Sequence, residues 1–392
     1  MNLILTDIDG RENLLPLSYT KHCAFLRIGL NTIQEKWQRA LGKQPQLHTI
    51  QYLQVYYQLQ IQETNLLVNA LALPNDDLIK AINYLDQGSV LSAGDVFIAA
   101  KISSQEMDNF MQYGTLPNDK VDYRGHVSVI KYPWHLFEFN DEQIRLDFEL
   151  VTKGRVSAKP HESATIIGDN VFIEPGAEVI NCSLNALDGP IYIGKNANVL
   201  DGAFIRGPFA LCESATVNMG AKIRSATTIG PHCKVGGEIN NSILTGYSNK
   251  AHDGFLGNSV IGEWCNLGAD TNNSNLKNNY GLVKVWNYKL NDFINTEKQF
   301  CGLIMGDHSK CGINTMFNTG TVVGVSANIF GAGFPPKNIP SFSWGGAGGF
   351  EPYDFYKAIN TARAVMERRN ITLDQKGIDV LKCVFELTKE TR

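Results

Sequence analysis

The chain has 392 residues, of which 36 are glycine, 43% are hydrophobic and 19% are charged. The hydrophobic fraction excludes wholesale disorder, and glycine does not recur at every third position, which excludes collagen. The formal net charge of −4 provides no electrostatic basis for binding nucleic acid or an anionic membrane surface. From the length we expect two or three domains.

Membrane insertion and secretion are not expected. No stretch is apolar over the roughly 20 residues that a membrane-spanning helix needs. The first ten residues, MNLILTDIDG, lack the basic start and long apolar run of a signal peptide. The eight cysteines form no CxxC pair, which is typical of reduced, mostly buried thiols. The sequence therefore predicts a cytoplasmic protein.

The first 150 residues alternate strand-like and helix-like stretches. Apolar runs at Leu3–Thr6 and Asp95–Ala100 predict buried strands. Apolar residues at helical spacing predict helices over Thr32–Leu41 and Asp76–Leu85. This alternation favours an α/β layer with a mostly parallel sheet. A polar stretch near residues 150–160 then predicts a linker.

From about residue 164 an aliphatic residue recurs at every sixth position. The longest unbroken run has eight members: Ile193, Val199, Ile205, Leu211, Val217, Ile223, Ile229 and Val235. A period of six fits neither an α-helix nor an isolated hairpin, and it predicts a parallel β-helix. In that fold each hexad forms a short strand and a tight turn, and three hexads close one triangular coil. The aliphatic side chain of each hexad then points into the interior.

The hexads are interrupted in three places. Residues 180–192 form a short insertion, residues 236–254 shift the register, and residues 269–304 form a long excursion. Long irregular excursions from a rigid repeat tend to carry function. Beyond the repeat, apolar residues at helical spacing predict two amphipathic helices within residues 353–390.

Residues 250–280 carry a family resemblance. They contain His252, then Phe255-Leu256-Gly257, then Asn266-Leu267-Gly268-Ala269-Asp270-Thr271. This order resembles the acetyltransferase half of the bifunctional N-acetylglucosamine-1-phosphate uridyltransferase/glucosamine-1-phosphate acetyltransferase family, in a Bacteroidetes-type variant. The resemblance implies an α/β nucleotidyltransferase-like (Rossmann-like) domain over residues 1–155. It further implies a left-handed parallel β-helix of hexapeptide repeats over 160–340 and C-terminal helices over 350–392.

The resemblance also implies roles for residues of the β-helix. His252 matches the general base, and histidine titrates near neutral pH, which suits removal of an amine proton. Asn266 and Asn275 match asparagines that contact the amino sugar. Lys284 matches a lysine near the substrate phosphate, with Lys277 as a nearby alternative for that cation. The backbone of Ala269 matches the contact with the acetyl group, where a donor can polarise the thioester carbonyl.

Two residues depart from the family pattern. Phe255 replaces the family tyrosine among the substrate contacts, so one hydroxyl contact is missing. Asp270 replaces the second glycine of Gly-Ala-Gly-Thr and adds a negative charge near a phosphorylated substrate. We expect both changes to affect the choice of acceptor.

The N-terminal domain resembles a sugar-1-phosphate nucleotidyltransferase. That family follows its first strand with Gly-Gly-x-Gly-Thr-Arg, whose backbone amides cradle a triphosphate. Here the strand leads into Asp-Ile-Asp-Gly-Arg, so only Gly10 of the glycines remains, followed by Arg11 and later Lys21. The resemblance implies nucleotide contacts by these three residues, and Mg²⁺ if the domain is active. Asn69-Ala70 stands where the family has the metal-binding Gly-Asp, so no metal ligand is assigned.

The function implied is that of a bifunctional enzyme. Its β-helix would transfer acetyl from acetyl-CoA to the amine of a hexosamine 1-phosphate, and its N-terminal domain would use a nucleoside triphosphate to form a UDP-sugar. A homotrimer is implied, because enzymes of this family bind acetyl-CoA between neighbouring subunits.

Two alternatives remain open. In the first alternative, the N-terminal domain is a regulatory or non-catalytic nucleotide-sugar-binding domain on a β-helix scaffold. The missing glycines and the missing metal aspartate of that domain motivate this alternative. The second is a zinc enzyme of the γ-carbonic anhydrase kind. It would need three converging histidines, and His232, His252 and His308 lie in the repeat region.

Overall fold

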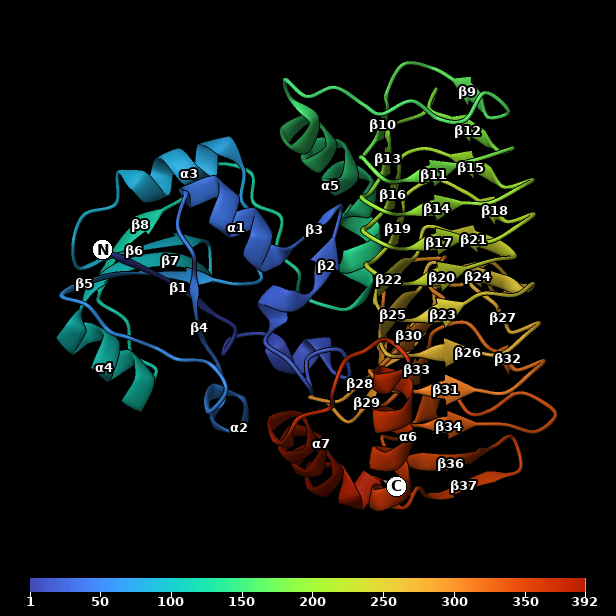
Figure 1. Cartoon of the computed structure of the whole chain (residues 1–392). Coiled ribbons are helices and arrows are strands. Elements are labelled where there is room, and N and C mark those ends of the chain that lie inside the picture. The colour runs from blue at the N-terminus through green and yellow to red at the C-terminus, as the bar shows by residue number, and fades with distance from the viewer. Residues whose placement is uncertain (392) are drawn as a thin grey trace. The chain divides into compact units, whose positions relative to one another are not determined.

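The computed structural model describes residues 1–391, which divide into two compact units (Figure 1). The first unit contains Met1–Leu14, Lys21–Leu26 and Asn31–Lys131. The second contains Leu15–Thr20, Arg27–Leu30 and the chain from Tyr132 onward. The predicted functional division into residues 1–155, 160–340 and 350–392 stays a prediction.

The first unit is built on a mixed β-sheet. Its strands are β1 (Asn2–Thr6), β3 (Asn31–Thr32), β4 (Gln46–His48), β5 (Thr64–Asn69), β6 (Ser89–Ala93), β7 (Val96–Ser103) and β8 (Asp119–Asp122). The main sheet has the order β4-β1-β5-β7-β6-β8. β1 pairs in parallel with β4 and β5, but β7 runs antiparallel to β5 and β6. The prediction of a mostly parallel sheet is therefore wrong for the part of the sheet that contains β7, which is antiparallel to both of its neighbours. The physical reason is the tight turn at Gly94, because so short a connection can only join antiparallel strands.

Capping side chains mark the starts of the three longest helices of the first unit. The helices of this unit are η1 (Arg11–Leu14), η2 (Cys23–Phe25), α1 (Ile33–Leu41), α2 (Gln51–Gln54), α3 (Asp76–Asn83) and α4 (Ser104–Tyr113). The predicted helices are confirmed as α1 and α3. At the start of α1 the Glu35 N–H donates to Thr32 Oγ1 (3.2 Å) while the Thr32 N–H donates to the Glu35 carboxylate (2.6 Å). This capping box fixes where the helix begins.

The second unit is a parallel β-helix whose strands form three faces, stacked coil upon coil in Figure 1. The first face contains β10 (Val171–Ile173), β13 (Ile191–Ile193), β16 (Phe209–Leu211), β19 (Thr227–Ile229), β22 (Ile243–Gly246), β25 (Val260–Glu263), β30 (Leu303–Met305), β33 (Thr321–Val323) and β35 (Asn338–Ile339). The second contains β11 (Glu178–Val179), β14 (Asn198–Val199), β17 (Thr216–Val217), β20 (Lys234–Val235), β23 (Asn249–Lys250), β26 (Asn266–Leu267), β31 (Lys310–Cys311), β34 (Asn328–Ile329), β36 (Ser343–Gly346) and β37 (Gly349–Pro352). The third contains β9 (Thr165–Ile167), β12 (Ser183–Asn185), β15 (Phe204–Arg206), β18 (Lys222–Ile223), β21 (Glu238–Asn240) and β24 (Phe255–Gly257).

The aliphatic residues of the hexads point into the β-helix, as predicted. All eight members of the unbroken run are buried. Ile193 pairs with Leu211 and Leu211 with Ile229, so each aliphatic residue stacks on the one three hexads away. The predicted fold class is thereby confirmed as an α/β unit, a parallel β-helix of hexads and C-terminal helices.

The long excursion folds as an antiparallel hairpin. Its strands are β28 (Lys284–Asn287) and β29 (Asp292–Asn295), with Trp286 opposite Phe293. Before and after the hairpin, β27 (Asn272–Asn273) and β32 (Met316–Phe317) form a separate parallel pair. The excursion is thus an ordered element of the second unit.

Helices cover parts of the β-helix. The predicted C-terminal helices are confirmed as α6 (Phe355–Glu367) and α7 (Gln375–Leu387), followed by η3 (Lys389–Thr391). They pack around Phe342, whose ring meets that of Phe385 edge-on with centroids 5.1 Å apart. α5 (Trp134–Thr152) and β2 (Arg27–Ile28) also belong to this unit, and Asn140 Nδ2 donates to the Ala226 carbonyl (2.8 Å).

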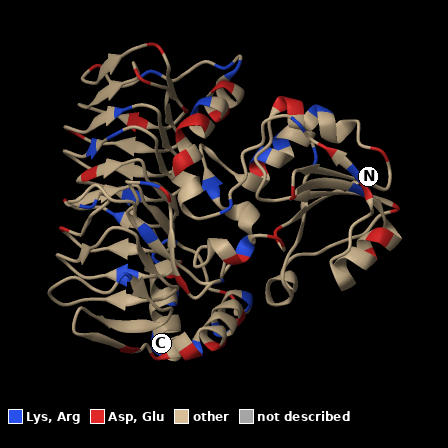
Figure 2. Cartoon of the chain, turned by 180° about the vertical axis from the view of Figure 1, so that it is seen from behind, with Lys and Arg blue, Asp and Glu red and all other residues tan. Residues whose placement is uncertain are grey.

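Charged residues of both signs are distributed over the second unit. Lys and Arg are interspersed with Asp and Glu along the β-helix (Figure 2). Within residues 1–391, no helix is long and apolar enough to cross a membrane.

Candidate functional site

His252 lies in the turn between β23 and β24. Its side chain is exposed, and in the described part of the chain the imidazole has no hydrogen-bond partner. The main chain of the turn is held by Lys250, whose Nζ donates to the carbonyls of His252 and Asp253. The turn therefore presents the imidazole on the surface from a fixed main chain.

Two asparagine side chains accept hydrogen bonds from the main chain of β24, the strand that follows this turn. The Phe255 N–H donates to Asn272 Oδ1 (2.8 Å) and the Gly257 N–H donates to Asn273 Oδ1 (2.8 Å). Asn273 Nδ2 returns a bond to the Gly257 carbonyl (3.0 Å). Side chains thus stand where a β-helix normally has main-chain ladder bonds. The regular sheet of this face ends at β24, one strand from the His252 turn.

Phe255 and Asn275, two predicted substrate contacts, meet at Gly257. A Cβ built on Gly257 would lie 2.5 Å from Phe255 Cζ and 2.7 Å from Asn275 Nδ2. Only glycine permits this approach. Asn275 Nδ2 also donates to Asn258 Oδ1 (2.8 Å), which fixes the orientation of the amide.

The turn after β26 stacks on the His252 turn. The Asp270 N–H donates to the Asp253 carbonyl (3.1 Å), and Asp270 has a left-handed φ of 55°. Ala269 lies beside it, and its carbonyl accepts from the Asn314 N–H (2.8 Å). Asn266 is exposed on β26. The structure therefore places Ala269 and Asp270 one coil away from His252.

A third lysine, Lys337, lies close to the two predicted phosphate-binding lysines, and the sequence analysis did not point to it. Lys277 Nζ donates to the Leu282 carbonyl, and Lys284 is exposed on β28. Lys337 Nζ donates to the Lys284 carbonyl (2.8 Å) and lies 5.5 Å from the centroid of the Phe293 ring. Burial and the charge of Lys277 lower the pKa of Lys337. Lys337 belongs to a later coil, so no local motif points to it.

In the first unit, the predicted nucleotide contacts Arg11 and Lys21 lie together but are buried. Arg11 Nε donates to Asp7 Oδ2 (3.4 Å) and Arg11 Nη2 to the Lys21 carbonyl (3.4 Å). The Cys23 N–H also donates to Asp7 Oδ2 (2.8 Å), and His22 Nε2 lies 3.8 Å from Asp7 Oδ1. Burial alone would raise the pKa of Asp7, but the charges of His22 and Arg11 lower it. Gly10 precedes this cluster with a φ of 90°.

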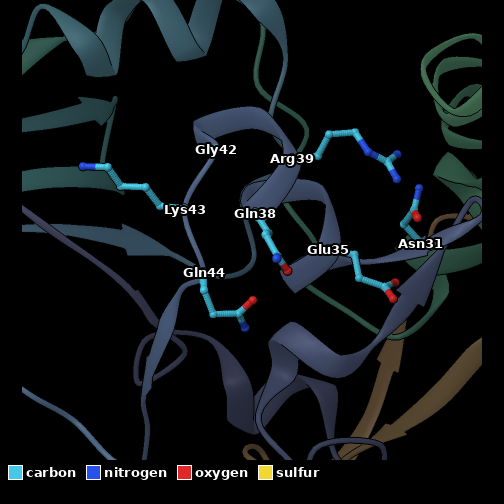
Figure 3. Close-up of a pocket in the computed structure, with 7 residues that line it drawn as sticks. All are labelled: Asn31, Glu35, Gln38, Arg39, Gly42, Lys43 and Gln44. Carbon is cyan, nitrogen blue, oxygen red and sulfur yellow. The ribbon is translucent and has the colours of Figure 1, made fainter. Parts of the chain in front are cut away.

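Two hollows lie in the first unit. One, of about 490 Å³, lies at the carboxyl ends of β1 and β4, the edge at which open α/β sheets bind ligands. It is lined by Ile8, His48, Thr49, Ile50, Gln51, Gln54, Leu59, Phe110, Met111 and Gly114. The other, of about 500 Å³, follows α1, where Glu35, Arg39 and Asn31 lie on one side and Lys43 points away (Figure 3). Among the described residues, the predicted nucleotide contacts line neither hollow.

The residues at the end of β5 do not fit Mg²⁺. Asn69 Nδ2 donates to the Phe97 carbonyl (2.9 Å) and its Oδ1 accepts from the Leu71 N–H (2.9 Å), so the amide is committed to the main chain. Ala70 supplies no side-chain oxygen, whereas Mg²⁺ prefers carboxylates. Within residues 1–391, no group of three or more His, Cys, Asp or Glu side chains could hold a metal ion. The roles of the predicted site residues stay predictions.

Known proteins are similar to parts of this chain. Residues 3–156 match the family model described as sugar nucleotidyl transferase. A bifunctional sugar-1-phosphate nucleotidylyltransferase/acetyltransferase of Sulfurisphaera tokodaii is 26% identical over 273 residues, which are 69% of this chain and 59% of that protein. The bifunctional protein GlmU of Methanocaldococcus jannaschii is 30% identical over 224 residues, 56% of this chain and 48% of that protein.

A solved UDP-N-acetylglucosamine acyltransferase of Francisella novicida has 17% identity and a TM-score of 0.33, over 59% of this chain and 87% of that one. The chain thus spans about half to three-fifths of the length of the two curated relatives. The predicted resemblance is supported: residues 3–156 match the sugar nucleotidyl transferase family model, and the chain is similar to bifunctional sugar-1-phosphate nucleotidyltransferase/acetyltransferases.

Proposed function

We propose that the β-helix, residues 160–340, transfers acetyl from acetyl-CoA to the amine of a hexosamine 1-phosphate. The observation that carries the proposal is the end of the regular third-face sheet at β24. There the His252 turn, the Phe255 ring and the Asn275 amide lie within one coil of each other. The name of the Sulfurisphaera tokodaii relative, which includes acetyltransferase, supports the same activity.

In this reaction the amine nitrogen attacks the carbonyl carbon of the thioester. His252 takes the proton that the nitrogen loses, the carbon–sulfur bond breaks, and CoA leaves and regains a proton as free thiol. A donor from the Ala269 backbone polarises the carbonyl oxygen. Asn266 and Asn275 orient the sugar, and Lys277 and Lys284 hold the phosphate.

We further propose that the N-terminal domain, residues 1–155, transfers a nucleotide to a sugar 1-phosphate. The hollow at the ends of β1 and β4 is the proposed nucleotide site. Gly10, Arg11 and Lys21 remain the predicted nucleotide contacts, although they do not line this hollow. Burial and pairing of Arg11 with Asp7 favour a second candidate, a domain that binds a nucleotide sugar without turnover. We also propose that the C-terminal helices form a separate part of the chain over residues 350–392. The protein is further proposed to be a homotrimer and to be cytoplasmic.

Two assays test these proposals separately. With acetyl-CoA and glucosamine 1-phosphate, the wild-type chain should release free thiol, and His252→Ala should abolish most of the release. With UTP or dTTP and sugar 1-phosphates, release of pyrophosphate distinguishes nucleotidyl transfer from binding alone. A wild-type chain that releases no thiol with any hexosamine phosphate contradicts the first proposal.

A further inference from the structure

Lys250 occupies an inward position of the β-helix. Along the second face, Val217 pairs with Val235 and Val235 pairs with Lys250, so a lysine follows two valines in the interior column. Lys250 is 0% exposed. In the preceding coils a hydrophobic side chain occupies this position, so the β-helix does not need a charged residue there.

Burying an ammonium is costly unless its donors are satisfied. Lysine has three N–H donors, and three main-chain carbonyls receive them. They belong to Gly236 (3.4 Å), Asp253 (2.8 Å) and His252. The bonds therefore use the full donor capacity of the ammonium.

The three carbonyls come from two neighbouring turns. Gly236 follows β20, whereas His252 and Asp253 form the turn after β23. One ammonium thus ties the turn that carries His252 to the coil before it. An aliphatic side chain would fill the same column but would leave these carbonyls without that donor.

We propose that Lys250 is a positioning residue that fixes the main chain of His252 for proton transfer. The inference rests on the proposed acetyl transfer. Proton transfer depends on placing the base within hydrogen-bond reach of the amine, and a small displacement of such a group lowers the rate substantially. Holding the turn that contains His252 is therefore the reason why a lysine occupies this interior position.

Lys250→Met tests the proposal, because methionine fits an apolar column and carries no donor. We expect kcat for acetyl transfer to fall at least tenfold while KM for acetyl-CoA changes less than threefold. The melting temperature should not fall. The matched control is Lys310→Met, since Lys310 Nζ donates to the His308 carbonyl (2.8 Å) two residues away in the same manner. That variant should keep the wild-type kcat.

A readout independent of activity separates this inference from the proposed function. Amide hydrogen exchange over residues 251–254 should become at least tenfold faster in Lys250→Met, and exchange in the other coils should stay unchanged. If the wild-type chain shows no acetyl transfer, the proposed function fails and hydrogen exchange alone decides the role of Lys250. Unchanged exchange over 251–254, or a wild-type kcat in Lys250→Met, overturns the proposal.

Discussion

Lys337 Nζ donates a hydrogen bond to the main-chain carbonyl of Lys284 at 2.8 Å, across 53 positions of sequence. The bond links the coil that contains β35 to the excursion hairpin, and it brings Lys337 close enough to Lys277 to lower its pKa together with burial. Like charges held together in this way favour an anion between them. The arrangement suits the phosphate of the proposed acceptor.

Lys337→Gln should therefore weaken acceptor binding. Loss of one charge-assisted contact costs about 1.5–3 kcal/mol, which is about a tenfold to hundredfold rise in KM for the hexosamine 1-phosphate. We expect kcat to change little, because the contact is made equally before and during the reaction. Steady-state kinetics measure both, with Lys376→Gln on α7 as the control. An unchanged KM would remove Lys337 from the acceptor site.

Asp270→Gly should be tolerated by the fold and should improve acceptor binding. Asp270 has a left-handed φ of 55°, which costs a non-glycine residue about 1 kcal/mol. Glycine relieves that strain and removes a negative charge from the turn next to His252. We expect the free energy of unfolding to hold or rise, and KM for the phosphorylated acceptor to fall severalfold. Urea unfolding and steady-state kinetics test the two effects, and a higher KM would contradict the second.

Lys250 makes stability depend on pH in a defined direction. Burial lowers the pKa of Lys250 to about 8, although the charges of Asp253, Cys311 and Asp270 act to raise it. Between about pH 8 and the ordinary lysine pKa of 10.5 the unfolded chain binds more protons than the folded one, so stability rises with pH. Below pH 8 both states are protonated and the full cost remains.

Lys250→Met should remove this rise. The stability difference between the variant and wild type should shrink on the order of 2 kcal/mol from pH 7 to pH 10. Urea unfolding of both chains at the two pH values measures it, because other titrating groups cancel in the comparison. Parallel pH profiles would show that Lys250 does not titrate differently in the folded state.

Sequence periodicity predicted the β-helix but could not locate the lysines that complete its site. A step of six from Val235 reaches Asn241 and Tyr247, so the register shift at residues 236–254 hides the inward position of Lys250. Lys337 joins the hairpin only through the closing of a later coil, which no local pattern encodes. The antiparallel β7 was likewise missed, because apolar runs do not carry strand direction.

Asp7→Asn should destabilise the first unit. Removing one member of a buried ion pair leaves an uncompensated charge on Arg11 and costs about 3–5 kcal/mol. Because the pKa of Asp7 is lowered, its contribution is present above the ordinary carboxyl pKa and is lost as pH falls through the lower folded value. Hydrogen exchange of strand β1 at pH 7 measures the effect. Exposed Asp9→Asn is the control and should change stability by less than about 0.5 kcal/mol.

We propose that His252 removes the amine proton during acetyl transfer. The most direct test of this role is the rate at which N-acetylated hexosamine 1-phosphate forms from acetyl-CoA, measured by mass spectrometry for wild type and His252→Asn. We predict product from the wild type and a fall in kcat of about 10²–10⁴-fold in the variant, with KM for acetyl-CoA within threefold. Equal rates of product formation by the two proteins would contradict this role of His252.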